Sequence, residues 1–211
     1  MTDLKSVVGR CLIVSAMALS SACSILPPAE PMDVYQLHGG PYSRLTGTKE
    51  LVQWSLRIDR PKASEALDSP RIAVVPQDNL ISSYKGARWS DAGPLMLRNQ
   101  IRDLFVTDHR VQAVSTDDTN LQADFELNGD LLAFQSEYRG AAIDVVIRYD
   151  ARLVDDRQRI IAGHRFEVRQ PAKGKEVPAV VAAFDTASNE LAWQVLEWTL
   201  QEGSKNHPSS R

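Results

Sequence analysis

Apolar and polar residues alternate over three consecutive segments in the second half of the chain. The alternation is clearest over 141–156, and segments 121–134 and 159–170 repeat it on either side with short polar connections. A period of two is that of a strand with one buried face. Three such strands joined by short turns predict an antiparallel meander. The residues of the meander that we expect to be buried against helices are Ile143, Val145, Ile147 and Phe166.

Two other segments have the period of an amphipathic helix. Segment 90–108 begins with Ser90 and Asp91 as candidate caps and has Pro94 in its first turn. Its apolar stripe consists of Leu97, Ile101, Leu104 and Phe105. The second helix is expected over 175–201, where the apolar residues at helical spacing are Val177, Val181, Phe184, Leu191, Val195 and Trp198.

Shorter apolar runs lie around the first helix. Segment 50–59 alternates, 71–76 is a β-branched run, 79–89 is typical of an edge hairpin, and 110–115 is a further short strand. Strands with one open face and two amphipathic helices to cover the other predict an α+β fold. We expect a two-layer sandwich, with a mostly antiparallel sheet and both helices packed on one face.

The second helix has apolar residues on opposite sides. With about 100° per residue, Trp193, Leu196 and Leu200 lie across the helix from Leu191. A helix that is apolar on two sides is usually covered twice. The second cover could be the N-terminal segment of the same domain, another copy of the chain or a partner protein. In the latter two cases, these three residues would form an interface with Trp193 as its anchor.

Composition and charge exclude several classes of protein. The chain has 211 residues, of which 43% are hydrophobic and 24% charged, as expected for a folded domain. The formal net charge is −3, and Lys and Arg are scattered along the chain. Such a distribution offers no extended basic surface for phosphates, so we expect no nucleic-acid partner.

The N-terminus has the organisation of an export signal. Lys5 and Arg10 precede an apolar run of about ten residues, too short to span a bilayer, and small residues follow it. The stretch "LSSACS" (19–24) resembles a bacterial lipobox, in which diacylglycerol is attached to the cysteine before cleavage on its N-terminal side. Cys23 would then carry covalent diacylglycerol and an N-acyl chain. The alternative is ordinary secretion, which would leave Cys23 as a free thiol prone to oxidation.

The expected organisation follows from this lipid anchor. Residues 1–22 form the signal peptide, 23–34 the lipidated cysteine and a proline-rich tether, 35–200 a single domain and 201–211 a flexible tail. By resemblance to other bacterial lipoproteins, Ser24 after the cysteine favours the periplasmic face of the outer membrane. We therefore expect a lipid-anchored periplasmic protein.

Candidate catalytic and metal-binding groups are few. His164 falls on the apolar side of a strand, where a core histidine is the favoured interpretation. The pairs Asp117–Asp118 and Asp155–Asp156 fall at expected turns, where Asp commonly accepts hydrogen bonds from the backbone. The sequence contains no HExxH, GxSxG, Walker or GxGxxG motif. We expect a non-catalytic protein without cofactor or metal.

Several stretches in a particular order resemble the ABC-type transport auxiliary lipoproteins, over about residues 33–200. These stretches are "DVYQL" (33–37), "LRIDRPKASEALDSPRIAVV" (56–75), "LISSYKGARWSDAGPLMLRNQIRDLF" (80–105) and "AIDVVIRYDARLVDDRQRIIAGHRFEV" (142–168). The step "ARWSD" is the most recognisable of them. Its tryptophan, Trp89, could contact a partner, or it could pack over the sheet.

The resemblance implies an accessory subunit of an intermembrane transport system. Its partners would be an MCE-domain protein and inner-membrane components of an ABC or paraquat-inducible type, and its cargo a phospholipid or another hydrophobic molecule. A homo-oligomer is also possible. The alternative is a carrier that encloses a lipid between sheet and helices. A periplasmic hydrolase would need a catalytic pair that the sequence does not contain.

Overall fold

A computed structural model of the chain describes residues 31–40, 50–119 and 121–207. In this part, residues from Met32 onward form one compact unit. The elements in chain order are β1 (Asp33–Tyr35), β2 (Leu56–Ile58), β3 (Lys62–Ala63), β4 (Arg71–Gln77), β5 (Leu80–Trp89), α2 (Gly93–Asp108), β6 (Val114–Thr116), β7 (Phe125–Arg139), β8 (Ala142–Asp155), β9 (Ile160–Pro171) and α3 (Val177–Asn206).

The expected meander is present as β7, β8 and β9, which pair antiparallel along nearly their full lengths. The other edge of β7 is shared by β2, β3 and β4, which all run parallel to it. Strand β5 pairs antiparallel with β4, β1 runs parallel to β5, and β6 runs parallel to β2. The sheet is therefore mixed, with more parallel pairing than we expected. Parallel neighbours need a crossover connection, and α2 lies in the one that leads from β5 to β7.

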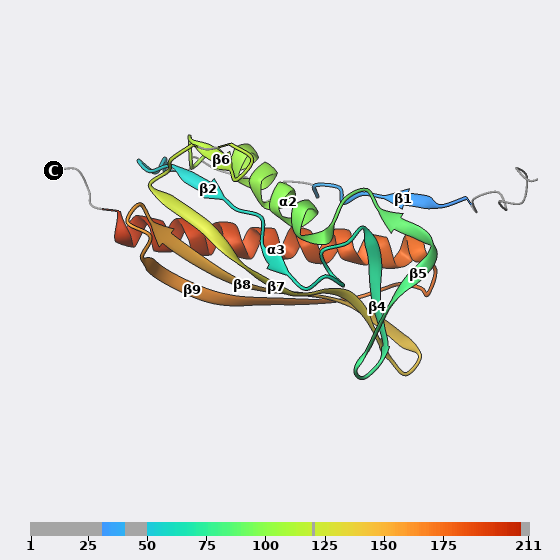
Figure 1. Ribbon diagram of the computed structural model, residues 1–211. Coiled ribbons are helices and arrows are strands. Elements are labelled where there is room, and N and C mark those ends of the chain that lie inside the picture. Colours follow the sequence, from blue (N-terminus) through green and yellow to red (C-terminus); the bar gives the residue numbers. More distant parts are fainter. Residues whose placement is uncertain (1–30, 41–49, 120, 208–211) are drawn as a thin grey trace, which may run out of the picture. The chain divides into compact units, whose positions relative to one another are not determined.

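The two helices lie on one face of the sheet, as expected for the α+β sandwich (Figure 1). Helix α3 packs against β8, β9 and α2. The meander residues expected to be buried, Ile143, Val145, Ile147 and Phe166, are at most 4% exposed. The apolar stripe of α2 is buried as well, from Leu97 to Phe105. The hydrophobic pattern therefore identified the core face of both layers.

Helix α2 begins later than the sequence suggested. Its N-cap is Ala92, which makes no side-chain capping bond, and Pro94 lies in the first turn. The candidate caps Ser90 and Asp91 lie before the helix because the chain there still extends the sheet. The backbone N–H of Ser90 donates to the carbonyl of Tyr35 in β1 at 2.6 Å.

Two of the short strands are shorter than their apolar patterns. Of segment 50–59 only Leu56–Ile58 is a strand, and Val52 forms an isolated bridge with Val111. Trp54, Leu56 and Ile58 are nevertheless buried, so the alternation reported burial correctly. The strand expected over 110–115 is limited to Val114–Thr116.

Helix α3 continues beyond residue 200 to Asn206, so the first residues of the segment expected to be a flexible tail are helical. The cause is a close contact at Gly203. A Cβ at this position would lie 2.5 Å from the ring of Trp54, so the indole of Trp54 packs directly on the helix backbone. Residues 208–211 lie outside the described part of the chain.

Candidate anchoring and docking surfaces

The expected lipidation site, Cys23, lies outside the described residues, and its acylation stays a prediction. The chain that follows it enters the fold at β1, ten positions later at Asp33. Strand β1 pairs with the end of β5, with Asp33 opposite Ala87 and Tyr35 opposite Trp89. The domain is therefore connected to its N-terminal segment at this edge of the sheet.

Side chains of α3 and α2 hold the residues after β1. The backbone N–H of His38 donates to Asp185 at 2.9 Å, and that of Gly40 donates to the Oδ1 of Asn189 at 2.8 Å. Gln100 of α2 donates to the same oxygen at 2.7 Å. Asn189 therefore links the N-terminal segment to both helices. Sequence reasoning missed these contacts. The signal for them was the pair of polar residues Asp185 and Asn189, four positions apart on a largely apolar helix.

Three of the four predicted interface residues are buried in the domain. Trp89 and Leu196 are 0% exposed, and Leu200 is 6% exposed. The second apolar side of α3 is covered within the domain by packing against α2 and by Trp54. This corrects the interface expectation for these three residues, because a side chain in the core cannot anchor a partner. Trp193 is half-buried and packs against the core, and its role in an interface stays a prediction.

Trp89 packs over the sheet in the core, which was the alternative interpretation from the sequence. Its ring lies 5.9 Å from that of Phe134 in β7 and 5.1 Å from that of Phe184 in α3, measured between centroids. The two phenylalanine rings lie 5.0 Å apart. These three aromatic side chains fill the space between sheet and helices at this point.

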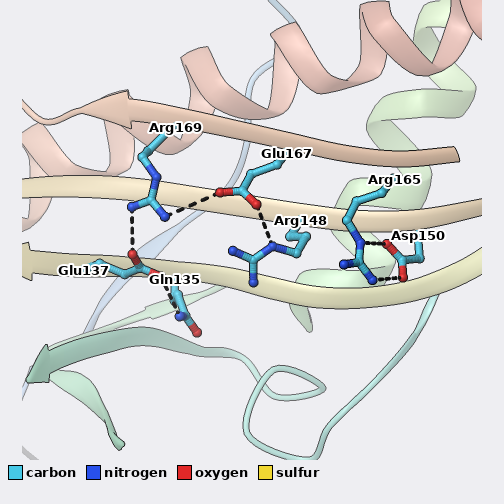
Figure 2. Close-up of polar contacts among 7 residues, drawn as sticks. All are labelled: Gln135, Glu137, Arg148, Asp150, Arg165, Glu167 and Arg169. Atoms are coloured by element: carbon cyan, nitrogen blue, oxygen red, sulfur yellow. Dashed lines mark hydrogen bonds and ion pairs between the residues drawn. The ribbon is translucent and has the colours of Figure 1, made fainter. Parts of the chain in front are cut away.

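The face of the sheet opposite the helices carries a ladder of ion pairs across β7, β8 and β9 (Figure 2). Arg165 binds Asp150 through two contacts of 2.6 Å, and Arg148 donates to Glu167 at 2.7 Å. Arg169 bridges Glu167 and Glu137, and Gln135 donates to Glu137 at 3.1 Å.

The charges of this ladder cancel. Arg148, Arg165 and Arg169 contribute three positive charges, and Glu137, Asp150 and Glu167 contribute three negative ones. Exposed pairs of this kind contribute about 0–1 kcal/mol each to stability. The ladder keeps the open face polar and without net charge, which suits a hydrated contact with a polar protein surface better than binding of an anionic polymer.

A second polar cluster lies on the pairing between β2 and β7. Arg57 forms ion pairs with both Asp59 and Glu126, and Asn128 donates to Glu126 at 2.7 Å. Burial raises the pKa of Asp59 to about 6, and a hydrogen bond to Glu126 adds to this effect. As pH falls, Asp59 is therefore the carboxyl of this pair that takes up a proton first, because Asn128 and Arg57 favour the charged form of Glu126.

Replacing Asp59 with Asn should stabilise the protein at neutral pH. An acid whose pKa is raised on folding favours the folded state in its protonated form, so the native chain loses stability as pH rises through about 6. The shift corresponds to at most about 3 kcal/mol, and solvent screening reduces this to about 1 kcal/mol. Melting temperatures of the full-length protein in detergent, measured below and above that pKa, should show a gain for Asp59→Asn that shrinks as pH falls.

Asp150 provides a control of opposite sign. Its hydrogen bonds to Arg165 lower its pKa, so Asp150→Asn should destabilise the protein at neutral pH, by an amount that shrinks as pH falls. A gain for Asp59→Asn that is independent of pH would contradict the assignment of the proton to Asp59.

The other titratable residues named from the sequence have structural partners. Arg98 of α2 is buried and pairs with Asp117 at 2.6 Å and Asp118 at 2.8 Å, so this acidic pair binds a side chain besides forming a turn. Asp155 accepts bonds from the backbone N–H of Arg157 and Arg159, as expected for a turn aspartate. His164 is exposed, with its ring 4.5 Å from that of Phe166, so the core interpretation was wrong.

Among the described residues, no three His, Cys, Asp or Glu side chains gather where they could hold a metal ion. Within residues 31–40, 50–119 and 121–207, no helix has the length and hydropathy needed to cross a bilayer. A shallow cleft of about 830 Å³ lies between the end of α3 and the segment before β2. Both charged and apolar residues line it, among them Arg110, Glu197 and Leu200.

Comparison with known proteins relates this fold to a family. A protein of Xanthomonas campestris known from its crystal structure matches with a TM-score of 0.74 and 27% identity, over 83% of this chain and 97% of that one. A second crystal structure, of an uncharacterised protein, matches with a TM-score of 0.62 at 15% identity, over 80% and 98% of the two chains. The second match is one of fold alone.

Sequence comparison adds two findings. An uncharacterised protein of Bradyrhizobium diazoefficiens is 30% identical over 148 residues, which are 69% of this chain and 39% of that relative. This chain thus spans well under half of that relative's length. The family model of the ABC-type transport auxiliary lipoprotein component matches residues 35–196, which is nearly the whole folded domain. The chain therefore belongs to the family of ABC-type transport auxiliary lipoprotein components.

Proposed function

We propose that this protein is a non-catalytic accessory subunit of an intermembrane transport system, anchored by lipid on Cys23 to the periplasmic face of the outer membrane. Its partners are an MCE-domain protein and the inner-membrane components of an ABC or paraquat-inducible type. The cargo of that system is a phospholipid or another hydrophobic molecule. The observation that carries the proposal is the family match over residues 35–196, together with the lipobox before it.

The packing of the domain favours a scaffold over a carrier. A carrier would need apolar space between sheet and helices. Trp89, Phe134 and Phe184 occupy that space in mutual contact, so an acyl chain would have to displace them. The open face of the sheet carries the neutral ion-pair ladder, which supports contacts with protein and not with acyl chains.

Co-purification tests the scaffold. The full-length protein, extracted in mild detergent, should bring down the MCE-domain protein of the same cell. Trp193→Glu should weaken this association, because Trp193 is the predicted anchor that remains partly exposed. Gln194→Glu is the matched control, since it introduces the same charge at the exposed neighbouring position. Lost association with an unchanged melting temperature supports the interface, whereas a lower melting temperature assigns Trp193 to the core.

Native mass spectrometry tests the carrier alternative. Delipidated and repurified protein should have the mass of the acylated chain or of a homo-oligomer of it. A stoichiometric additional phospholipid would contradict the scaffold and support the carrier. Absence of the MCE-domain protein from the co-purified material, with folded bait, would contradict the proposed partnership.

A further inference from the structure

The hairpin formed by β4 and β5 has an apolar tip that the rest of the domain leaves exposed. Leu80 and Ile81 follow the turn at Asp78–Asn79 and are each 45% exposed. Consecutive residues in a strand point to opposite faces. Both faces of the hairpin are therefore apolar and exposed at its tip.

A second hairpin projects beside it. Strand β4 runs parallel to β7, with Ala73 opposite Gln135 and Val75 opposite Glu137. The turn after β4 and the turn after β7 therefore lie at the same end of the sheet, as the two adjacent loops in Figure 1 show. Small exposed residues, Gly140 to Ala142, form the second tip.

The N-terminal segment enters the fold at the base of the β4–β5 hairpin, and its length allows Cys23 and the hairpin tip to reach one surface. Asp33 lies opposite Ala87, which is seven positions from Leu80 along β5. Seven extended residues span at most about 24 Å, and paired strands lie about 5 Å apart. Asp33 is therefore within about 29 Å of the hairpin tip. The ten residues from Cys23 to Asp33, which contain three prolines, reach about 31 Å at about 3.1 Å per residue. A bilayer surface that holds the lipid on Cys23 can thus also touch the tip.

The charge of the hairpin agrees with a lipid surface. Residues 71–89 contain Arg71, Lys85 and Arg88 against Asp78, a net charge of +2, whereas the whole chain has −3. Arg71 and Arg88 lie opposite each other at the base of the hairpin, so Lys85 is its basic residue nearest the tip. A basic residue close to anionic lipids contributes about 1 kcal/mol of attraction. The hairpin therefore combines an apolar tip with a basic stem on an otherwise acidic chain.

We infer that the tip of the β4–β5 hairpin, with Leu80 and Ile81, inserts into the interfacial region of the bilayer to which Cys23 is anchored. This inference rests on the lipid anchor of the proposed function. Two points of contact, the acyl chains and the hairpin, fix the orientation of the domain on the membrane. The helices and the ion-pair ladder are then held in a constant direction for a protein partner.

A fluorescent label at the tip tests this contact. Cys11 lies in the signal peptide and Cys23 is the acylated residue, so Ile81→Cys provides the one free thiol of the mature full-length protein. The variant is labelled with nitrobenzoxadiazole and reconstituted into vesicles of phosphatidylethanolamine and phosphatidylglycerol. The matched control is Ile160→Cys, which places the same label at another exposed isoleucine, at the start of β9.

We expect the label at position 81 to shift to shorter wavelength, to be quenched by spin-labelled lipid and to be shielded from aqueous iodide. The label at 160 should remain accessible to iodide. Protein that floats with the vesicles but has equal iodide quenching at both positions would overturn the hairpin contact and leave the anchor in place. Protein that does not float would overturn the anchor and the contact together. The measurement is repeated at less than one protein per vesicle. Loss of the shielding of the position-81 label from iodide under this condition would assign the tip to contact with a second copy of the chain and overturn the lipid contact.

Discussion

Replacing Cys23 with Ala should release the protein from the membrane fraction or leave it unprocessed with its signal peptide. Two or more acyl chains on one residue anchor a protein stably in a bilayer, whereas a single chain holds it only marginally. The apolar hairpin tip adds two side chains, which cannot replace these acyl chains. The measurement is fractionation of cells with and without a carbonate wash, together with the mass of the mature chain.

Cys11→Ala is the matched control, because Cys11 is the other cysteine of the chain and lies in the segment expected to be removed. It should leave both fractionation and mature mass unchanged. Membrane association of Cys23→Ala at the normal mature mass would refute the anchor and with it the outer-membrane assignment.

Truncating Trp89 to Ala should lower the free energy of unfolding by about 3–5 kcal/mol, the usual cost of removing a buried aromatic side chain. The indole is 0% exposed and lies against Phe134 and Phe184, which join sheet to helix. The loss would therefore weaken the contact between the two layers. Chemical denaturation of the full-length protein in detergent, followed by circular dichroism, measures the change.

Trp198→Ala is the matched control for size and chemistry. Trp198 is half-buried on α3, with its ring 5.7 Å from that of Phe166, so its truncation should cost clearly less. Equal decreases in the free energy of unfolding for the two variants would contradict the conclusion that Trp89 joins the sheet to the helices. Lost partner binding by a Trp89→Ala protein of normal stability would return this residue to the interface.

The hydrophobic pattern was sufficient to predict the meander strands and both helices, because the period of apolar residues within each segment identifies its buried face. In the meander, period-two alternation places Ile143, Val145 and Ile147 on one face, whatever packs against it. Both helices were likewise found from their stripes. Composition and the predicted N-terminal signal restricted the expected function class, because charge distribution and the cysteine position do not depend on the fold.

Pairing between distant segments was decided by the tertiary structure. The parallel contacts of β2, β3 and β4 with β7 depend on how the chain crosses over through α2, and a strand pattern is the same in parallel and antiparallel pairs. The ion-pair ladder has the same origin. Alternation predicts a polar face, but only the register places Arg165 beside Asp150 and Arg148 beside Glu167.

The tertiary structure also decided whether the second apolar side of α3 is buried within the domain. Leu196 and Leu200 gave the same pattern as an interface would, and only the packing of α2 and Trp54 assigned them to the core. Asn189 bonds to Gly40 from 149 positions away, a contact that no local pattern encodes. The sequence by itself determined which faces are apolar, and it predicts a lipidation signal at Cys23. The tertiary structure decided which apolar faces meet within the domain, because burial depends on neighbours that only the folded chain brings together.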